Sequence, residues 1–156
     1  MIRVLFVCLG NICRSPMAEA MFRDVVKREG LEDRILIDSA GTGNWHIGHP
    51  PHKGTLEILE KNKISCEGLK ARQIQSRDLE EFDYIIAMDS DNKANIKVLK
   101  TANSKAKIEV LLDYVQHIEN KNVPDPYYTG NFQEVYDLVK QGCENLMEHI
   151  KKTDLS

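Results

Sequence analysis

A change from strand to helix is encoded in one short stretch, Val7-Cys8-Leu9-Gly10-Asn11-Ile12-Cys13-Arg14-Ser15-Pro16. The run from Val4 to Val7 is short and apolar throughout, which is typical of a buried parallel strand. Ser15 belongs to the residue types that cap helices, and Pro16 suits the first helical position. We therefore expect a strand that delivers Cys8 to its carboxyl end, then a tight loop, then a helix.

The loop carries a cysteine and an arginine at its two ends, in the pattern Cys-x5-Arg-Ser. Backbone N–H groups in such a loop can converge on an anion, and the helix N-terminus adds positive potential. The same potential favours the thiolate form of a cysteine, which is the nucleophile. Arg14 can hold two phosphoryl oxygens at once. The pattern predicts that Cys8 attacks a phosphate, which is bound by Arg14 and by the other loop residues, Leu9, Gly10, Asn11, Ile12, Cys13 and Ser15.

Three loop residues have further expected roles. Asn11 tolerates the left-handed backbone conformation that a tight anion loop needs. The Ser15 hydroxyl can donate to the Cys8 sulfur, both as attacking and as leaving group. Two interpretations of Cys13 stay open, because it can be a small core residue or a redox partner that traps oxidised Cys8 as a disulfide.

A second unusual stretch lies over a hundred residues away, at Pro124-Asp125-Pro126-Tyr127-Tyr128. Two prolines hold the Asp125 carboxylate on a stiff loop, and cleavage of a phosphate ester needs a proton donor for the leaving oxygen. Tyr127 and Tyr128 can offer aromatic walls to a flat leaving group. A turn with surface tyrosines is the alternative, and the Cys-x5-Arg-Ser loop favours the catalytic interpretation.

The loop at 41–51 contains the single tryptophan, Trp45, which we expect to line the cleft rather than the core. His46, His49 and His52 match no common zinc spacing, so we predict a polar surface loop and no metal site. On the last helix, Cys143 is expected in the core, and no role is assigned to Cys66.

The composition is that of an ordinary globular chain of 156 residues, and we expect one domain over 1–156. A net charge of −3 gives no reason to expect nucleic-acid binding, and no apolar run is long enough to span a membrane. Four cysteines are sparse for a disulfide scaffold, which favours a reducing, cytoplasmic compartment. Met1-Ile2-Arg3 leads directly into a strand, so no secretory signal is expected, although export without one stays open.

Apolar patterning alternates strands with helices. Strands are predicted at 3–8, 34–40, 84–88 and 108–112, and helices at 15–29, 55–61, 76–82, 90–100 and from 132 onward. This order predicts an α/β fold with a mainly parallel sheet and helices on both faces. Ligands bind outside the carboxyl ends of such strands, where Cys8, Ser39-Ala40-Gly41 and Met88-Asp89 are expected.

Taken together, the motifs resemble those of the low-molecular-weight protein tyrosine phosphatases over nearly the whole chain. Besides the Cys8 loop and the Asp125 stretch, the matching pieces are Asp38-Ser39-Ala40-Gly41 with Trp45 and Pro50-Pro51, Ala71-Arg72-Gln73, and Phe82-Asp83-Tyr84-Ile85 with Met88-Asp89. In some family members a histidine precedes Ala-Arg-Gln, where this chain has Leu69-Lys70, so the support of Asn11 is expected to differ.

The resemblance implies a single-domain, Rossmann-like, three-layer fold with a four-stranded parallel sheet. It implies Cys8 as nucleophile, Arg14 as phosphate clamp and Asp125 as acid and then base, with Asn11, Ser15 and Ser39 shaping the loop. It also implies a tyrosine-phosphorylated protein or peptide as substrate, a phosphocysteine intermediate, inorganic phosphate as product, no metal or organic cofactor, and a monomer or weak self-association. Three rivals are a protein arginine phosphatase, an arsenate reductase of the same fold and a phosphotyrosine-binding or phospho-carrier module without turnover.

Overall fold

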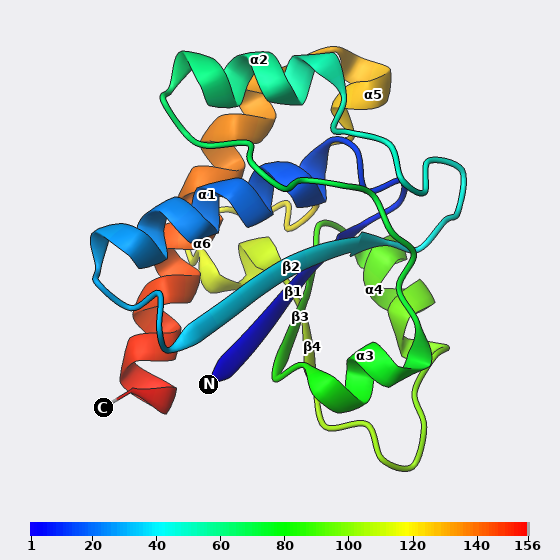
Figure 1. Cartoon of the computed structure of the whole chain (residues 1–156). Coiled ribbons are helices and arrows are strands. Elements are labelled where there is room, and N and C mark those ends of the chain that lie inside the picture. The colour runs from blue at the N-terminus through cyan, green and yellow to red at the C-terminus, as the bar shows by residue number, and fades with distance from the viewer. Residues whose placement is uncertain (156) are drawn as a thin grey trace.

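A parallel sheet of four strands forms the centre of the molecule (Figure 1). The structure is a computed structural model, and it describes residues 1–155. The strands lie in the order β2-β1-β3-β4. Their bounds are β1 (Ile2–Cys8), β2 (Ile35–Gly41), β3 (Tyr84–Ala87) and β4 (Lys107–Val110). In this register Cys8 pairs with Gly41, and Val7 pairs with both Ala40 and Ala87. The predicted four-stranded parallel α/β sheet is confirmed.

Helices cover both faces of this sheet, so β1 is buried on both sides. From β1, Val4 and Phe6 face a core shared with α1 (Arg14–Arg28) and α6 (Phe132–Asp154). Leu5 and Val7 face a second core, which is completed by α3 (Ser76–Glu81) and α4 (Ser90–Lys97). A further helix, α2 (Lys53–Lys61), packs against α1 and α6. In residues 1–155 we find no helix with both the length and the apolar character needed to span a membrane.

The end of the fourth strand differs from its prediction. β4 stops at Val110, and a 3-10 helix, η1 (Leu111–Tyr114), follows. Leu111 is fully buried because it packs on α6, where a Cβ atom on Gly142 would lie 2.4 Å from the Leu111 Cγ atom. The apolar run therefore continues past the strand because it meets a helix.

Two helix starts also differ from their predictions. Ser15 does not cap α1; Cys13 holds that position without a side-chain hydrogen bond, because the Ser15 hydroxyl bonds within the Cys8 loop. Residues 123–130, predicted as a loop, contain the short helix α5 (Pro126–Thr129). It begins there because the Asp125 carboxylate accepts the N–H of Tyr127 and Pro126 occupies the first turn.

Candidate active site

The Cys8 loop leaves the carboxyl end of β1 in a conformation suited to hold an anion. The carbonyl oxygens of Cys8, Leu9, Ile12 and Cys13 all accept hydrogen bonds from elsewhere in the chain. The backbone N–H groups from Leu9 to Cys13 donate to no acceptor within residues 1–155. Since the carbonyl groups are turned outward and satisfied, these N–H groups remain available to converge on an anion.

Asn11 adopts the left-handed conformation that the sequence predicts, with a φ of 56°. Its side-chain nitrogen donates to the Ser15 hydroxyl at 2.7 Å and to the Ser39 hydroxyl at 3.0 Å. Ser15 Oγ lies 3.0 Å from Cys8 Sγ. Because the amide donates to Ser15, the hydroxyl hydrogen of Ser15 is left to point at the sulfur or at the Ala40 carbonyl. The structure thus brings Asn11, Ser15 and Ser39, the three residues that the resemblance assigns to loop support, into one chain of hydrogen bonds.

A buried carboxylate that the sequence analysis missed ends this chain of hydrogen bonds. Glu19, on α1, accepts the Ser39 hydroxyl at 2.6 Å and is 7% exposed. Burial raises the pKa of Glu19 above its usual value and the nearby Asp38 adds to the rise, although the Ser39 hydrogen bond and Arg23 oppose it. Its position four residues after Ser15 places both side chains on the same face of α1, which was the only available signal.

The side-chain oxygen of Asn11 accepts a hydrogen bond from a backbone N–H group. The Arg72 N–H donates to Asn11 Oδ1 at 3.0 Å, while the Arg72 side chain pairs with Asp38 and Asp78 at 3.0 Å each. Leu69, which stands where some relatives have a histidine, is buried in the core. In this chain the support of Asn11 Oδ1 is therefore a main-chain donor whose residue is fixed by two ion pairs.

Arg14 is 3% exposed and is held from one side. Its Nη1 donates to Asp89 Oδ2 at 2.6 Å and to the Val123 carbonyl at 3.0 Å, and its Nη2 lies 3.4 Å from Asp125 Oδ2. Buried Nε has no hydrogen-bond partner in residues 1–155. Burial alone would lower the pKa of Arg14, but the charges of Cys8, Asp89 and Asp125 outweigh it and raise that pKa. One edge of a permanently charged guanidinium is thus free to bind an anion.

Asp89 has a second role that the sequence did not reveal. Its Oδ1 caps α4 by accepting the Asn92 N–H at 2.8 Å, and its Oδ2 accepts a hydrogen bond from Arg14. One feature of the sequence could have indicated this contact with Arg14. Asp89 comes at the carboxyl end of β3, and Cys8 lies at the same edge of the sheet.

A cleft of 330 Å³ brings the separated motifs together. Cys8, Arg14 and Asp125 line it, and its walls include Trp45, His46, Tyr127 and Tyr128. Trp45 lies in the lining of this cleft rather than in the core, and it is 66% exposed. Three aromatic walls around a cysteine and an arginine form a slot for a flat group that carries an anion.

Of the three histidines near this cleft, His49 is exposed as predicted, whereas His52 has a structural role in the fold. The Nδ1 atom of His52 accepts the Gly54 N–H and caps α2, and its ring stacks on Phe132 at 5.1 Å between centroids. The N–H of His52 donates to the Ile12 carbonyl at 2.7 Å. Among the described residues no cluster of His, Cys, Asp or Glu could hold a metal ion.

The remaining three thiols are partly or fully buried. Burial raises the pKa of Cys13 to about 12, with a smaller contribution from the charge of Cys8. Cys143 is fully buried in the core, as predicted, and Cys66 is half-buried near the Ile64 carbonyl.

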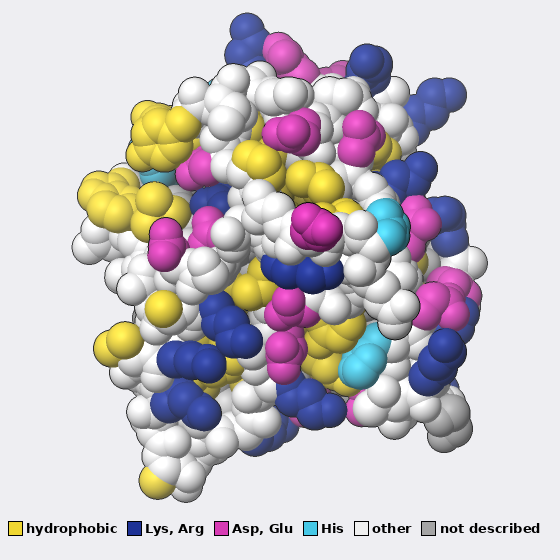
Figure 2. Space-filling model, turned by 180° about the vertical axis from the view of Figure 1, so that it is seen from behind, with side chains coloured by type: hydrophobic (Ala, Val, Ile, Leu, Met, Phe, Trp, Pro, Cys, Tyr) yellow, Lys and Arg dark blue, Asp and Glu magenta, His cyan; other side chains and the backbone are white. Residues whose placement is uncertain are grey.

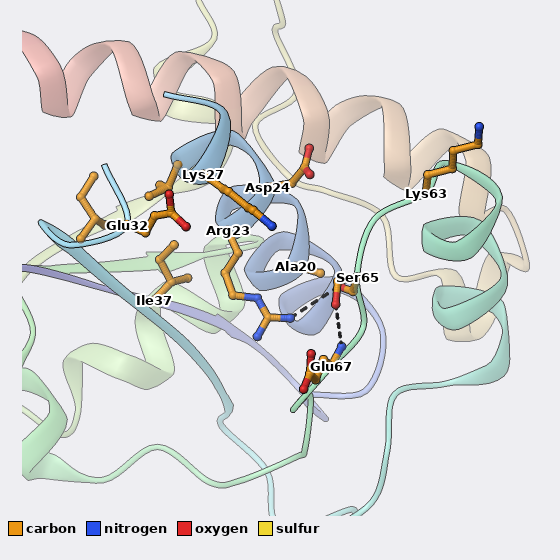
Figure 3. A pocket seen from close by; sticks show the side chains of 11 residues that line it. Ala20, Arg23, Asp24, Lys27, Glu32, Ile37, Lys63, Ser65 and Glu67 are labelled. Atoms are coloured by element: carbon orange, nitrogen blue, oxygen red, sulfur yellow. Dashed lines mark hydrogen bonds between the residues drawn. The ribbon is translucent and has the colours of Figure 1, made fainter. Parts of the chain in front are cut away.

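A larger cavity, of 580 Å³, lies between α1, β2 and residues 63–67 (Figure 3). No cysteine is among the described residues that line it. Arg23 crosses it, with Nη2 3.5 Å from the Ser65 carbonyl and Nη1 3.7 Å from Glu19. Through Arg23 the cavity therefore reaches Glu19, at the outer end of the hydrogen-bond chain, but it does not reach Cys8.

A parallel α/β sheet with a cysteine–arginine loop at the end of β1 defines a class of cysteine-based phosphatases. The chain belongs to the low molecular weight phosphotyrosine protein phosphatase family, whose profile matches residues 3–155.

Individual relatives agree with this assignment. The chain is 57% identical over 152 residues to low molecular weight protein-tyrosine-phosphatase YfkJ of Bacillus subtilis (strain 168), covering 97% of each. The YfkJ crystal structure aligns with a TM-score of 0.93 at 56% identity, over 99% of this chain and 97% of that one. PtpA of Staphylococcus aureus (strain MRSA252) is 47% identical over 97% of this chain and 96% of its own. A Drosophila arginine phosphatase aligns with a TM-score of 0.90 at 34% identity, over 98% of this chain and 100% of that one.

Proposed function

We propose that this protein hydrolyses phosphotyrosine in proteins or peptides through a phosphocysteine intermediate. The observation that carries the proposal is that Cys8, Arg14 and Asp125 line one cleft, although more than a hundred residues separate Cys8 from Asp125. Family membership supports the reaction class, and relatives such as YfkJ are named protein-tyrosine-phosphatases.

In the first step the Cys8 thiolate attacks phosphorus, a sulfur–phosphorus bond forms and the bond to the phenolic oxygen breaks. Asp125 gives its proton to that oxygen, so the leaving group departs as a neutral phenol. The free edge of Arg14 and the loop N–H groups of Leu9 to Cys13 stabilise the charge on the equatorial oxygens.

In the second step Asp125, now a carboxylate, takes a proton from water while the water oxygen attacks phosphorus. The sulfur–phosphorus bond breaks, phosphate leaves, and Cys8 returns to the thiolate. Ser15 Oγ, 3.0 Å from the sulfur, supplies the hydrogen bond that stabilises this leaving thiolate.

The aromatic walls support a phenolic substrate. Trp45, Tyr127 and Tyr128 face the cleft, where a flat ring can lie against them. The likeness to an arginine phosphatase makes phosphoarginine the second candidate. Measuring the phosphate released from matched peptides that carry phosphotyrosine, phosphoarginine or phosphoserine separates the candidates, and we expect phosphotyrosine to be turned over fastest.

Arsenate reduction needs further cysteines that relay a disulfide to an external thiol. Cys143 is fully buried, and Cys66 lies outside both the cleft and the Cys8 loop. These positions argue against a disulfide relay through either thiol. We further propose a single domain over 1–156 and a cytoplasmic location, where the four free cysteines stay reduced.

Aryl phosphate hydrolysis, run beside thioredoxin-dependent arsenate reduction, tests the proposal. We expect phosphate release and no arsenate reduction. Cys8→Ser should abolish turnover but still bind phosphate, because the loop N–H groups and Arg14 remain, whereas Cys66→Ser should retain activity as the matched control. Turnover by Cys8→Ser at the wild-type rate would exclude the phosphocysteine mechanism.

A further inference from the structure

A second pocket, also of 330 Å³, lies directly beside the phosphate cleft. The two hollows share Leu9 and Trp45 as a common wall. Beyond that wall the pocket is bounded by Thr42 and Gly43 of the loop after β2, by Gln73 and Ile74, and by Asn95, Val98 and Leu99 at the end of α4. A group bound in the cleft therefore has this pocket as its neighbour.

The common wall is fixed in place. A Cβ atom on Gly43 would lie 1.9 Å from an indole carbon of Trp45, so the ring packs directly on the Gly43 backbone. The Gly43 N–H in turn donates to the Leu9 carbonyl at 2.9 Å. Because glycine permits this contact, the indole stands as a partition between the two hollows rather than folding into either.

Exposed apolar side chains are concentrated at this mouth. Of the seven large apolar side chains exposed in residues 1–155, Trp45, Tyr127, Tyr128 and Val98 line the cleft or the pocket, and Ile47 lies on the same loop as Trp45. Figure 2 shows large apolar side chains at the edge of the molecule where α5 and the loop after β2 lie, whereas acids and bases are mixed over the rest of that face. Such a concentration is typical of a binding surface.

The lining of the second pocket includes no charged side chain among the described residues. An acidic or basic group placed there would lose water without gaining a partner, which costs free energy. An apolar side chain would instead gain by covering Val98, which is 81% exposed, and Leu99. The chemistry of the lining thus selects an uncharged, apolar occupant.

The geometry of a peptide indicates where that occupant comes from. In an extended chain the side chains of residues i and i+2 point to the same side, roughly 7 Å apart. A peptide whose phosphotyrosine enters the cleft therefore presents a neighbouring side chain across the Trp45 partition.

We propose that this second pocket is a specificity subsite for an apolar side chain, located within two residues of the phosphotyrosine in a peptide substrate. This inference rests on the proposed function. It makes Trp45 a shared wall, which contacts the phosphotyrosine ring on one side and the neighbouring side chain on the other.

A peptide series tests the subsite. The parent is an acetylated Ala-Ala-phosphotyrosine-Ala-Ala, in which each alanine is replaced in turn by Leu or Glu. We expect Leu on one flank to raise kcat/KM about tenfold, mainly through KM, and Glu at the same position to give no gain. In Val98→Gln the preference for Leu should shrink severalfold, while the kcat/KM for para-nitrophenyl phosphate, which has no flanking residue, stays at the wild-type value.

The matched control is Leu36→Gln, because Leu36 is also an exposed apolar residue but lies on β2 outside both hollows. The preference of the Leu36→Gln variant for the Leu-containing peptide over the alanine parent should equal that of the wild type. Equal rates for Leu, Ala and Glu at all four positions, with para-nitrophenyl phosphate still hydrolysed, would overturn the subsite alone. Failure to hydrolyse any aryl phosphate would overturn the proposed function. If Val98→Gln changes the sedimentation coefficient of the protein but leaves its preference among the peptides unchanged, the second pocket is a contact between two copies of this chain, and the proposal is wrong.

Discussion

At the scale of single residues, Asp125 combines two functions in one carboxylate. Its Oδ1 caps α5, and its Oδ2 faces Arg14 at 3.4 Å across the cleft. An asparagine can still accept the Tyr127 N–H, so Asp125→Asn preserves the helix start while removing the transferable proton. We expect kcat to fall by about 10²–10⁴-fold for aryl phosphates with poor leaving groups, and much less for good ones.

A series of aryl phosphates with graded leaving groups measures this effect. Asp33→Asn, which changes an exposed aspartate elsewhere, controls for the loss of one charge. If Asp125→Asn slows good and poor leaving groups equally, Asp125 is not the general acid.

Cys13 illustrates how burial can limit a reaction that the sequence permits. Peroxide converts the Cys8 thiolate to a sulfenic acid, and the Cys13 thiolate can then attack that sulfur, forming a disulfide and releasing water's conjugate base. Burial, the larger cause, keeps the pKa of Cys13 well above neutrality even after the charge of Cys8 is lost. Below its pKa the thiolate fraction rises about tenfold per pH unit, so the yield of disulfide relative to Cys8 sulfinic acid should rise between pH 6 and pH 9.

Mass spectrometry of the peroxide-treated protein gives both products. Cys13→Ser should give only the sulfinic acid at every pH. A wild-type protein that forms sulfinic acid with Cys13 untouched, even at pH 9, would show that Cys13 is a core residue and not a redox partner.

At the scale of elements, α1 carries both Arg14 and the buried Glu19. Ionisation of Glu19 lowers the free energy of unfolding, because burial disfavours the charged carboxylate. The pKa of Glu19 is raised in the fold, first by burial and then by Asp38, against the opposing effects of the Ser39 hydrogen bond, Arg23 and Arg72. For a raised carboxyl pKa, the stabilising contribution is complete below the unfolded value, roughly 4.3, and is lost as pH rises through the folded value. Glu19→Gln should therefore gain stability relative to the wild type as pH rises from 5 to 8.

Urea unfolding at several pH values measures this difference. Glu57→Gln is the control, because Glu57 is an exposed member of an i,i+4 pair with Lys53 and its effect should be nearly independent of pH. A difference between Glu19→Gln and wild type that does not change with pH would mean that Glu19 is ionised alike in the folded and unfolded chains, so that its pKa is not raised by the fold.

Most elements could be predicted because the core imposes a period on the sequence. The run Val4–Val7 is fully buried on both faces, so it is apolar without alternation, and this predicted the central strand. The exceptions are places where a side chain has a partner distant in sequence. Ser15 resembles an N-cap but bonds in the Cys8 loop, and Leu111 continues a strand-like run but packs against α6.

At the scale of the whole molecule, the site could be predicted only as separate motifs. Cys8, Arg14 and Asp125 were found because their residue types and spacing carry the chemistry. Glu19 was not found, and Asp89 was placed at the ligand edge without its contact to Arg14, because no local spacing records the hydrogen bonds to Ser39 and Arg14. The strand order β2-β1-β3-β4 places the carboxyl ends of β1 and β3 side by side, which is why these residues meet.

Arg14 links the two halves of the cleft, so anion binding there should stabilise the entire fold. Its guanidinium joins the Cys8 loop to Asp89, Val123 and Asp125. A ligand that binds only the folded state adds about 2.7 kcal/mol at a concentration of 100 times Kd, which corresponds to several degrees in Tm for a chain of this size. We expect inorganic phosphate to raise Tm by this amount, and Cys8→Ser to show the same rise.

Arg14→Lys should lose most of that rise, since a lysine keeps one charge but cannot supply both the bond to Asp89 and a bidentate grip on phosphate. Thermal unfolding in phosphate and in chloride at matched ionic strength separates specific binding from screening. An unchanged phosphate effect in Arg14→Lys would mean that the stabilising anion sits elsewhere, with the cavity crossed by Arg23 as the first place to look. The size of the loss thus measures how much of the stabilisation by phosphate depends on a single buried guanidinium at the junction of distant segments.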